Sequence, residues 1–547
     1  MTGTTQPLSI AEGQWHFLNG DWHDFESGML GVAKDDVCRD GDAMQGHHYA
    51  FARHRCFADM RVRFEFRVGN HTDAGIVLHA VGESDFYLLH FPGCAQSSRG
   101  QHFFAALSRM DRDGFLRGIK LEMVRRVSSH PTEWKESELI LRGNRLEVRI
   151  GNHGLFELSH PGLEGTGCLG LHFCSTNPEA HAPLRNVMVD GEETGDTWNE
   201  SVRQSANWFK PVPPDGYAWQ KPNDLVELPD GELLLTYDVA NNDDSTDDAN
   251  NALMLTRSSD QGRSWSNPVP LDLDDRTEAF FPPRLHLTPG GRLIALLMKD
   301  DAFWTRESKD GGVAWSSPSP VNIPAWHKDR TIRFNIPPQA FVNLADGAML
   351  VFGYGQVRGY SRGELFTWGG EHHQAFSCRS TDDGRTWSEP VNVDNRGCNR
   401  KGEPIDGNMD LTEMSAVQTG DGGIMGLIRP VYSPWMWETW SNDGGVTWGP
   451  CVRGPFPGYA TTNLLCTKAG ALLIAHRQPS MMIHCSRDDG HTWDEGTQVD
   501  SGLWCMGVLR EVEPDVVLHV YWDTFQSHMR AQRYRVLPDR IEPARVG

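Results

Sequence analysis

The chain has 547 residues, which is more than one hydrophobic core usually holds, so a single small module is excluded. It carries 51 Lys and Arg against 73 Asp and Glu, a net charge of −22, and its basic residues form no cluster. This balance argues against nucleic acid and against anionic membrane surfaces as partners. No uninterrupted apolar run of about 18 residues is present, so we expect no membrane-spanning helix.

Residues 1–195 are predicted to form a β-sandwich of the jelly-roll type. Segments in which apolar and polar residues alternate follow one another here, for example DMRVRFEFRV, AGIVLHAV, DFYLLHF and ELILRGNRLEVRIG. RGNRLEVRIGNHGLFELSH, followed by GTGCLGLHF, resembles laminin-G and concanavalin-like domains. That resemblance implies either glycan binding or bracing of a catalytic domain. The polar connector DGEETGDTWNESVRQSAN marks the predicted boundary.

Six hairpins recur in residues 196–547. Each has an apolar strand, a tight turn and a second apolar strand, and the turns lie 60, 56, 75, 48 and 45 residues apart. Their turn residues are Gly231, Gly291, Gly347, Gly422, Gly470 and Asp515. This spacing leaves room for four short strands per repeat. The sequence therefore predicts an all-β protein in which a six-bladed β-propeller follows the sandwich.

A second repeat, S-x-D-x-G-x-(T/S/A)-W, runs out of phase with the hairpins. Its Asp can accept backbone N–H bonds in a tight turn, its Gly supplies a positive φ, and its Trp packs as an anchor. The five copies are residues 258–265, 308–315, 380–387, 441–448 and 486–493. This is the Asp box, and over 205–547 the chain resembles the sialidase (neuraminidase, BNR-repeat) superfamily of six-bladed propellers. Because such boxes occur in propellers of many activities, we expect them to hold strands together and to do no chemistry.

Propeller geometry predicts where functional residues gather. If the hairpin turns and the Asp boxes lie at one end of each sheet, first-strand starts and second-strand ends meet at the other end. The polar and aromatic residues there are Lys221, Asn223, Asp224, Asp238, Arg284, Lys299, Asp300, Arg333, Asn335, Tyr354, Glu413, Arg429, Thr462, Asn463, Arg477, Trp504 and Asp523. These charges either pair in a closed ionic plug or line a sugar pocket, where arginines hold a carboxylate and acids transfer protons.

The sialidase resemblance implies roles for particular residues. A Glu that opens the fourth blade and the substrate-binding Arg that ends its hairpin match Glu413 and Arg429, and the next blade offers Arg477. The general acid/base is expected in the loop before the third strand of the first blade, at Asp247. Alternatives in the same acidic loop are Asp243, Asp244 and Asp248. This loop could instead bind calcium or be a solvated run.

Two positions depart from the sialidase pattern. Lys221-Pro222-Asn223 stands where sialidases have Arg-Ile-Pro, so one of three carboxylate-binding arginines is missing or replaced by a lysine. Leu503 and Trp504 stand where the nucleophilic Tyr is expected, so the usual covalent route has no nucleophile at its place.

Three other routes remain open. Glu413 and Asp247 could act as an inverting pair around a water, or a tyrosine from another loop, such as Tyr217 or Tyr354, could substitute. A histidine could also transfer the proton, and the pair at the predicted entry to the third strand of the third blade is His372 and His373.

The leading hypothesis is an exo-acting glycoside hydrolase that removes a terminal, acidic or uronate-linked sugar. Asp247 would be the general acid, Glu413 the general base or its orienter, and Arg429 with Arg477 the anion clamp. Further predicted substrate-binding residues are Lys221, Asp224, Arg284, Arg333 and Trp504. The alternatives are an α-L-rhamnosidase or polysaccharide lyase that uses the histidines, and a non-catalytic glycan-binding protein. We expect a carbohydrate substrate as partner, no nucleic acid, no membrane, no cofactor and no metal, and the sequence does not indicate an oligomeric state.

The eleven cysteines are scattered, odd in number and never spaced as CxxC. We therefore expect mostly reduced, buried thiols without a zinc site, which favours a cytoplasmic location. The N-terminal segment MTGTTQPLSIAEGQ has neither the basic start nor the apolar stretch of a secretory signal, which agrees with that expectation. The alternative is a secreted protein whose signal was trimmed from this sequence.

Overall fold

The computed structural model describes most of the chain as β-strands. The described residues are 5–37, 47–69, 72–93, 103–124, 133–175, 178–199, 208–212, 219–240, 251–271, 283–299, 302–321, 341–361, 371–398, 411–430, 435–458, 461–477, 481–500, 507–523 and 528–544. Across these ranges, none of the helices has the length and apolar character needed to cross a membrane. The prediction of an all-β protein is confirmed.

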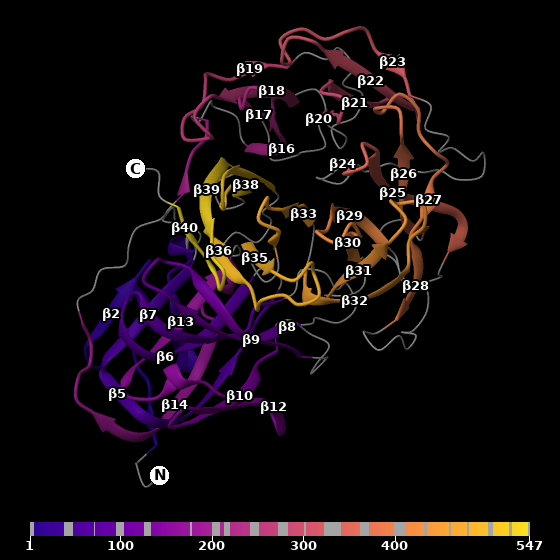
Figure 1. Ribbon diagram of the computed structural model, residues 1–547. Helices are drawn as coiled ribbons and strands as arrows, with labels where there is room; N and C mark the ends of the chain where they lie inside the picture. Colours follow the sequence, from indigo (N-terminus) through magenta and orange to yellow (C-terminus); the bar gives the residue numbers. More distant parts are fainter. Residues whose placement is uncertain are drawn as a thin grey trace. The chain divides into compact units, whose positions relative to one another are not determined.

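The chain divides into two compact units (Figure 1). The N-terminal unit comprises Met1–Ala206, Gln478–Met482 and Glu495–Leu503, and the propeller unit comprises Asn207–Arg477, Ile483–Asp494 and Trp504–Gly547.

The N-terminal unit contains fourteen of the described strands before residue 195, and four short 3-10 helices. The strands are β1 (Gln6–Pro7), β2 (Trp15–Leu18), β3 (Trp22–Phe25), β4 (Met29–Val32), β5 (His47–Phe66), β6 (Thr72–Gly82), β7 (Asp85–His90), β8 (Phe103–Met110), β9 (Leu116–Val124), β10 (Lys135–Arg142), β11 (Arg145–Ile150), β12 (His153–Ser159), β13 (Gly167–Ser175) and β14 (Leu184–Thr194). The helices are η1 (Glu26–Gly28), η2 (Lys34–Asp36), η3 (Pro161–Leu163) and η4 (Pro178–Ala180).

Strand β5 organises this unit because it pairs antiparallel with β2, β10, β13 and β14. In its second half, Val62, Phe64 and Phe66 are buried in the main apolar core, whereas the intervening Arg61, Arg63 and Glu65 are more exposed. The alternation of apolar and polar residues in DMRVRFEFRV therefore predicted this strand correctly, because one face of its sheet is buried and the other is more exposed.

One strand of the N-terminal unit comes from far along the chain. Strand β36 (Thr497–Asp500) pairs antiparallel with β9, with Thr497 opposite Arg117 and Gln498 opposite Leu116. The Gln498 side-chain amide also lies 2.8 Å from His47 Nε2 in the interior. Residues 495–503 are thus part of the same packed unit as the first 200 residues.

In the propeller unit, five separate sheets are formed by the described residues. They consist of β16 (Trp219–Glu227), β17 (Leu233–Ala240), β18 (Asn251–Ser258) and β19 (Val269–Pro270); β20 (Arg284–Leu287), β21 (Leu293–Lys299), β22 (Ala302–Ser308) and β23 (Ser319–Pro320); β24 (Phe341–Asn343), β25 (Met349–Ser361), β26 (Glu371–Ser380) and β27 (Val391–Asn392); β28 (Asp394–Cys398), β29 (Leu411–Gln418), β30 (Ile424–Pro430), β31 (Trp435–Ser441) and β32 (Pro450–Pro457); and β15 (Trp208–Phe209), β37 (Gly507–Glu513), β38 (Val516–Asp523), β39 (His528–Val536) and β40 (Ile541–Pro543).

The expected number of six separate blades is wrong, because the described residues form five. The remaining predicted hairpin exists as β33 (Thr461–Cys466) paired with β34 (Leu472–Arg477), followed by β35 (Met481–Ser486). The last strand of this group, β36, pairs with β9 of the N-terminal unit, so β33, β34, β35 and β36 do not form a separate sheet. A repeat in the sequence shows that a hairpin forms, but it does not show which partner the outermost strand takes.

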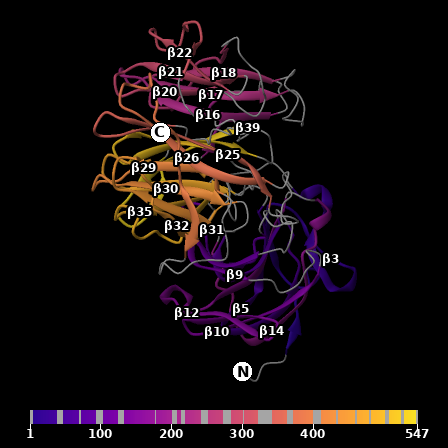
Figure 2. The same cartoon turned by 90° about the vertical axis from the view of Figure 1, so that its right-hand side faces the viewer.

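The sheets of the propeller unit surround a common centre (Figure 1). Within one sheet, β16, β17 and β18 lie side by side, as Figure 2 shows from the side. The innermost strand β16 contacts β20 and β37, β33 contacts β29 and β37, and β25 contacts β29. Apolar clusters fill the space between neighbouring sheets, which keeps the first strands close to the centre.

The six predicted turn residues all have positive φ, from 58° at Asp515 to 91° at Gly470. A Cβ at Gly231, Gly347 or Gly470 would meet no atom within 4 Å, so space does not require glycine there. The backbone conformation favours glycine at these turns, because residues with a side chain rarely adopt a positive φ.

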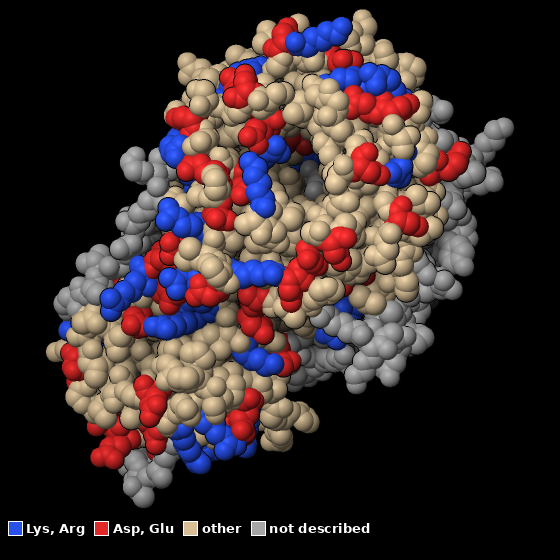
Figure 3. Space-filling view, in the orientation of Figure 1, with Lys and Arg blue, Asp and Glu red and all other residues tan. Residues whose placement is uncertain are grey.

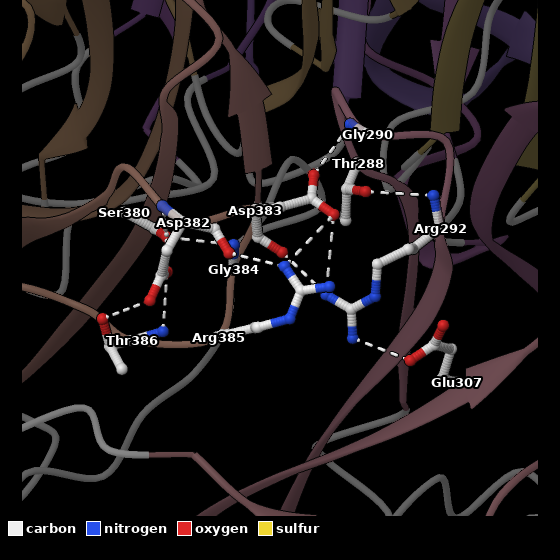
Figure 4. Close-up of polar contacts among 10 residues, drawn as sticks. All are labelled: Thr288, Gly290, Arg292, Glu307, Ser380, Asp382, Asp383, Gly384, Arg385 and Thr386. Atoms are coloured by element: carbon white, nitrogen blue, oxygen red, sulfur yellow. Dashed lines mark hydrogen bonds and ion pairs between the residues drawn. The ribbon is translucent and has the colours of Figure 1, made fainter.

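The Asp boxes hold strands together as expected. In the box of β26, the Asp382 carboxylate accepts bonds from Ser380 Oγ at 2.8 Å, Thr386 N at 2.8 Å and Thr386 Oγ1 at 2.6 Å (Figure 4). The next residue, Asp383, accepts from Gly290 N at 2.8 Å in the hairpin turn of the neighbouring sheet. The box therefore closes its own turn and links two sheets.

Arg292 extends this link between the same two sheets. It donates to the Asp383 carbonyl at 2.8 Å and to Glu307 Oε2 at 2.9 Å (Figure 4). The bond to Asp383 connects the two sheets at their turn end, whereas the bond to Glu307 lies within the sheet of Arg292.

One pair of cysteines departs from the reduced state expected of most of them. Cys56 of β5 and Cys168 of β13 lie opposite each other in register and form a disulfide. Among the described cysteines, the free ones are Cys174, Cys378, Cys451, Cys466 and Cys485.

Candidate functional site

The predicted site lies at the ends of the propeller strands that are farther from the hairpin turns. Register places Lys221 opposite Asp238 and Thr461 opposite His476, in each case at the far end of the hairpin from its turn. Figure 3 shows one face of the propeller unit, with a hollow at its centre and acidic and basic side chains at the rim of that hollow. Because the innermost strands contact one another around the centre, polar residues at their ends can face a shared space.

Glu413 and Arg429 come together as predicted from the first and second strands of one sheet. Arg429 Nη1 donates to Glu413 Oε1 at 2.9 Å, and the Glu413 side chain is only 8% exposed. The second carboxylate oxygen, Oε2, is buried and has no hydrogen-bond partner. An ionisable group with one oxygen held and the other left over is suited to contact a ligand or a water.

Asp224 and Arg284 join the first strands of two neighbouring sheets. Leu285 N donates to Asp224 Oδ2 at 3.0 Å, and Arg284 Nη1 donates to the Asn223 carbonyl at 2.9 Å and lies 3.9 Å from Asp224 Oδ1. Burial raises the pKa of the Asp224 carboxyl to about 6, although the Arg284 charge opposes this shift. A carboxyl with such a pKa can give or take a proton near neutral pH.

Several buried polar atoms near these residues have no hydrogen-bond partner. Asn223 is fully buried, and neither its side-chain oxygen nor its nitrogen is paired. The same holds for Asn463 Oδ1, Arg284 Nε and both ring nitrogens of His476. Because unpaired buried polar atoms cost free energy and are rare in native proteins, their presence on β16, β20, β29, β33 and β34 needs an explanation.

The turn ends of the same innermost strands contain paired groups instead. Asn343 donates to the Leu287 carbonyl at 2.9 Å and lies 2.7 Å from His286 Nε2. Gln418 accepts from Ala345 N at 2.7 Å, and Arg510 donates to Glu227 at 3.2 Å. These bonds connect neighbouring sheets, so polar groups there have a structural purpose.

The other predicted site residues are only partly described. Arg477 is the last residue of β34. His372 and His373 lie near the start of β26, opposite Val357 and Gln356 in the register. For these three residues the structure describes the backbone only. Predicted site residues and their alternatives that lie outside the described residues are Asp243, Asp244, Asp247, Asp248, Arg333 and Trp504.

Sequence reasoning missed His476, which directly precedes Arg477 on β34. Its ring stacks with Phe456 at 5.2 Å and with His484 at 5.0 Å between centroids. Burial lowers the pKa of His476 well below its ordinary value, so the ring is neutral at physiological pH. Its burial could have been expected from the apolar run LLIAH, but its lack of polar partners could not.

Within the described part of the propeller unit, no three His, Cys, Asp or Glu ligand atoms lie close enough to hold a metal ion. The polar groups of the site are carboxylates, guanidinium groups and amides. This set can bind hydroxyl and carboxylate groups and can transfer protons.

Comparisons with known proteins agree with the propeller architecture. The profile of the BNR repeat-like domain family matches residues 118–366 and 339–504. A search of the curated proteins found no significant match.

Among solved structures, a protein of unknown function from Dyadobacter fermentans is similar with a TM-score of 0.49 and 14% identity, over 62% of this chain and 99% of that one. A Hadza microbial sialidase has a TM-score of 0.43 and 16% identity, over 94% and 98% of the two chains. A leech intramolecular trans-sialidase has a TM-score of 0.41 and 12% identity, over 97% and 98%.

Proposed function

Because the chain belongs to the BNR repeat-like domain family, within the sialidase and BNR propeller superfamily, we propose that it is an exo-acting glycoside hydrolase. Its substrate would be a glycan whose terminal sugar carries a carboxylate or is attached to a uronate. A pocket at the centre of a propeller admits a chain end more readily than a chain middle, which supports the exo mode.

One observation carries this proposal: buried polar atoms without partners cluster at one end of the innermost strands. Glu413 Oε2, the Asn223 amide and Asn463 Oδ1 can each make a hydrogen bond that the free protein does not make. A sugar offers many hydroxyl donors and acceptors at short spacing. Binding such a ligand would satisfy these atoms and recover free energy that the free protein lacks.

In this proposal Glu413 is the general base, or orients the base, and Arg429 holds both Glu413 and an anionic group of the sugar. Arg477 would complete the anion clamp, and Asp247 would be the general acid. Asp224 is a second candidate for proton transfer, because burial raises its pKa to about 6. The proposed route avoids the tyrosine nucleophile, since Leu503 and Trp504 occupy its expected place in the sequence.

The experiment is a product assay on the full chain with terminal acidic and uronate-linked oligosaccharides and matched neutral ones. We expect release of one terminal monosaccharide with a new reducing end, from acidic or uronate-linked substrates in preference to neutral ones. Products are identified by mass spectrometry, and the anomer formed first is read by proton NMR.

Two other outcomes would contradict the proposal. An unsaturated uronate, which absorbs in the ultraviolet, would show a lyase. Binding of an acidic oligosaccharide without any release would show a glycan-binding protein.

A further inference from the structure

The disulfide of the N-terminal unit is built into two paired strands. Cys56 and Cys168 are directly opposite in the β5–β13 register, and both side chains are buried, with 1% and 0% exposure. Two sulfurs that face each other in a sheet stay close together whether or not they are bonded. The strands therefore preorganise a pair of soft ligands.

The carboxylate of Asp196, in the segment that follows β14, lies close to the two cysteine sulfurs. The sulfurs of Cys56 and Cys168 and a carboxylate oxygen of Asp196 all lie within 4.8 Å of one another. The Asp196 side chain is 47% exposed, whereas the sulfurs are buried. The sulfur pair is thus closed on the core side, and a carboxylate stands where solvent can reach it.

The segment that carries Asp196 is fixed over the cysteines. Thr194 Oγ1 donates to the Cys56 carbonyl at 3.1 Å, and Asn199 N donates to the Val81 carbonyl at 2.9 Å. Between them, the Trp198 ring packs against Phe51 at 5.1 Å between centroids. Asp196 is therefore held near the sulfurs by contacts that do not depend on the disulfide.

We propose that Cys56, Cys168 and Asp196 form a redox-gated site for a thiophilic divalent cation, with Zn²⁺ as the preferred ion. Zinc takes thiolate sulfur at about 2.3 Å and carboxylate oxygen at about 2.0–2.2 Å in a tetrahedron, so its ligand atoms must lie within a few ångströms of one another. The three ligand atoms meet this requirement once the sulfur–sulfur bond opens. Water takes the fourth position.

The chemistry balances with a dithiol as reductant. The dithiol transfers two electrons and two protons to the disulfide, which yields two cysteine thiols and the oxidised dithiol. Binding of the cation then releases both thiol protons, because the ligands are thiolates. Arg53, which lies 3.6 Å from Asp196, gives up its ion pair to the incoming cation. In the oxidised protein the sulfurs are bonded to each other, and the site is closed.

The test titrates Co²⁺ into two preparations of the full chain. One is oxidised; the other is reduced with dithiothreitol, which is then removed in the absence of oxygen. Thiolate-bound Co²⁺ gives a charge-transfer band in the near ultraviolet, and added Zn²⁺ should remove it. The variants are Asp196→Asn, which keeps both cysteines, and Cys168→Ser. The matched control is Cys174→Ser, a buried free cysteine on the same strand β13.

We expect the reduced protein and the Cys174→Ser variant to bind one Co²⁺ with the thiolate band, and the oxidised protein to show no band. Asp196→Asn should bind at least about tenfold more weakly, and Cys168→Ser should lose the band. Equal bands before and after reduction, or a reduced Asp196→Asn variant with unchanged affinity, would overturn the proposal. If Cys168→Ser does not fold, the comparison of wild type with Asp196→Asn still decides.

Discussion

The two ends of the innermost propeller strands treat polar groups in opposite ways. At the turn end, Asn343, Gln418 and Asp383 of an Asp box bond to neighbouring sheets. At the other end, Asn223 and Glu413 Oε2 are buried without partners. A paired group stabilises the fold, whereas an unpaired buried group destabilises it unless a ligand is bound. The comparison separates residues kept for structure from residues kept for function.

The largest expected effect is on catalysis. Glu413→Gln keeps the acceptor for Arg429 but removes the charge, and we expect turnover to fall by about 10²–10⁴-fold, as for loss of a general acid or base. Glu227→Gln is the matched control, because Glu227 pairs with Arg510 at the turn end. Steady-state rates of sugar release measure both. Full activity of Glu413→Gln would remove this residue from the mechanism.

The next effect is on stability at the turn end. Asp382→Ala removes an acceptor of three hydrogen bonds, and we expect a loss of about 3 kcal/mol in the free energy of unfolding. Asp230→Ala removes only the bond from Glu232 N and should cost about 1 kcal/mol. Urea denaturation followed by tryptophan fluorescence compares the two. Equal losses would mean that the box contributes no more than an ordinary turn.

The pH dependence of stability should have opposite signs at the two ends. Burial raises the pKa of Asp382, but hydrogen bonds from Thr386 and Ser380 outweigh it, so the net pKa is lowered. Asp382 therefore contributes stability above the unfolded pKa, and that stability is lost as the pH falls through the folded pKa. For Asp224, burial raises the folded pKa to about 6, above the ordinary value of an aspartate, so its contribution to stability is present at low pH and lost as the pH rises through 6.

Asp224→Asn tests this difference. Relative to the variant, the wild type should lose about 2 kcal/mol between pH 4 and pH 7. Denaturation curves at several pH values measure it. If the free energy of unfolding depends on pH in the same way in both proteins, the pKa of Asp224 is not raised in the folded protein.

The smallest expected effect is an increase in the free energy of unfolding, whereas most substitutions lower it. Asn223→Leu replaces an unpaired buried amide by an apolar group of similar size, so we expect a gain of about 1 kcal/mol in stability together with weaker substrate binding. Asn343→Leu, at the turn end, should instead lose about 1 kcal/mol, because Asn343 is paired. Thermal unfolding and KM are the measurements. A loss of stability in Asn223→Leu would mean that its amide has partners.

The sequence predicted features that depend on local chemistry. Turn residues that require positive φ, such as Gly231 and Asp515, located the hairpins, and the box pattern located the closed turns. The pairing of Glu413 with Arg429 followed because both lie on one hairpin, at its end away from the turn. Short-range geometry of this kind is encoded by residue type and spacing.

Features that depend on long-range packing were not predictable. Cys56 and Cys168 are 112 residues apart with no local pattern, so neither their register nor their disulfide could be read from spacing. The pairing of β36 with β9 joins regions that share no repeat. The missing partners of Asn223 and His476 appear only when every neighbouring atom is placed, since an amide or imidazole in a strand is normally paired.

The membership of residues 495–503 in the N-terminal unit has a consequence for biosynthesis. As the polypeptide leaves the ribosome, strand β9 lacks its neighbour β36 until Thr497–Asp500 has been made. An early product that ends near residue 206 would therefore expose an open sheet edge, which invites aggregation unless a chaperone covers it. Attempts to express this unit alone should graft the returning strand onto it.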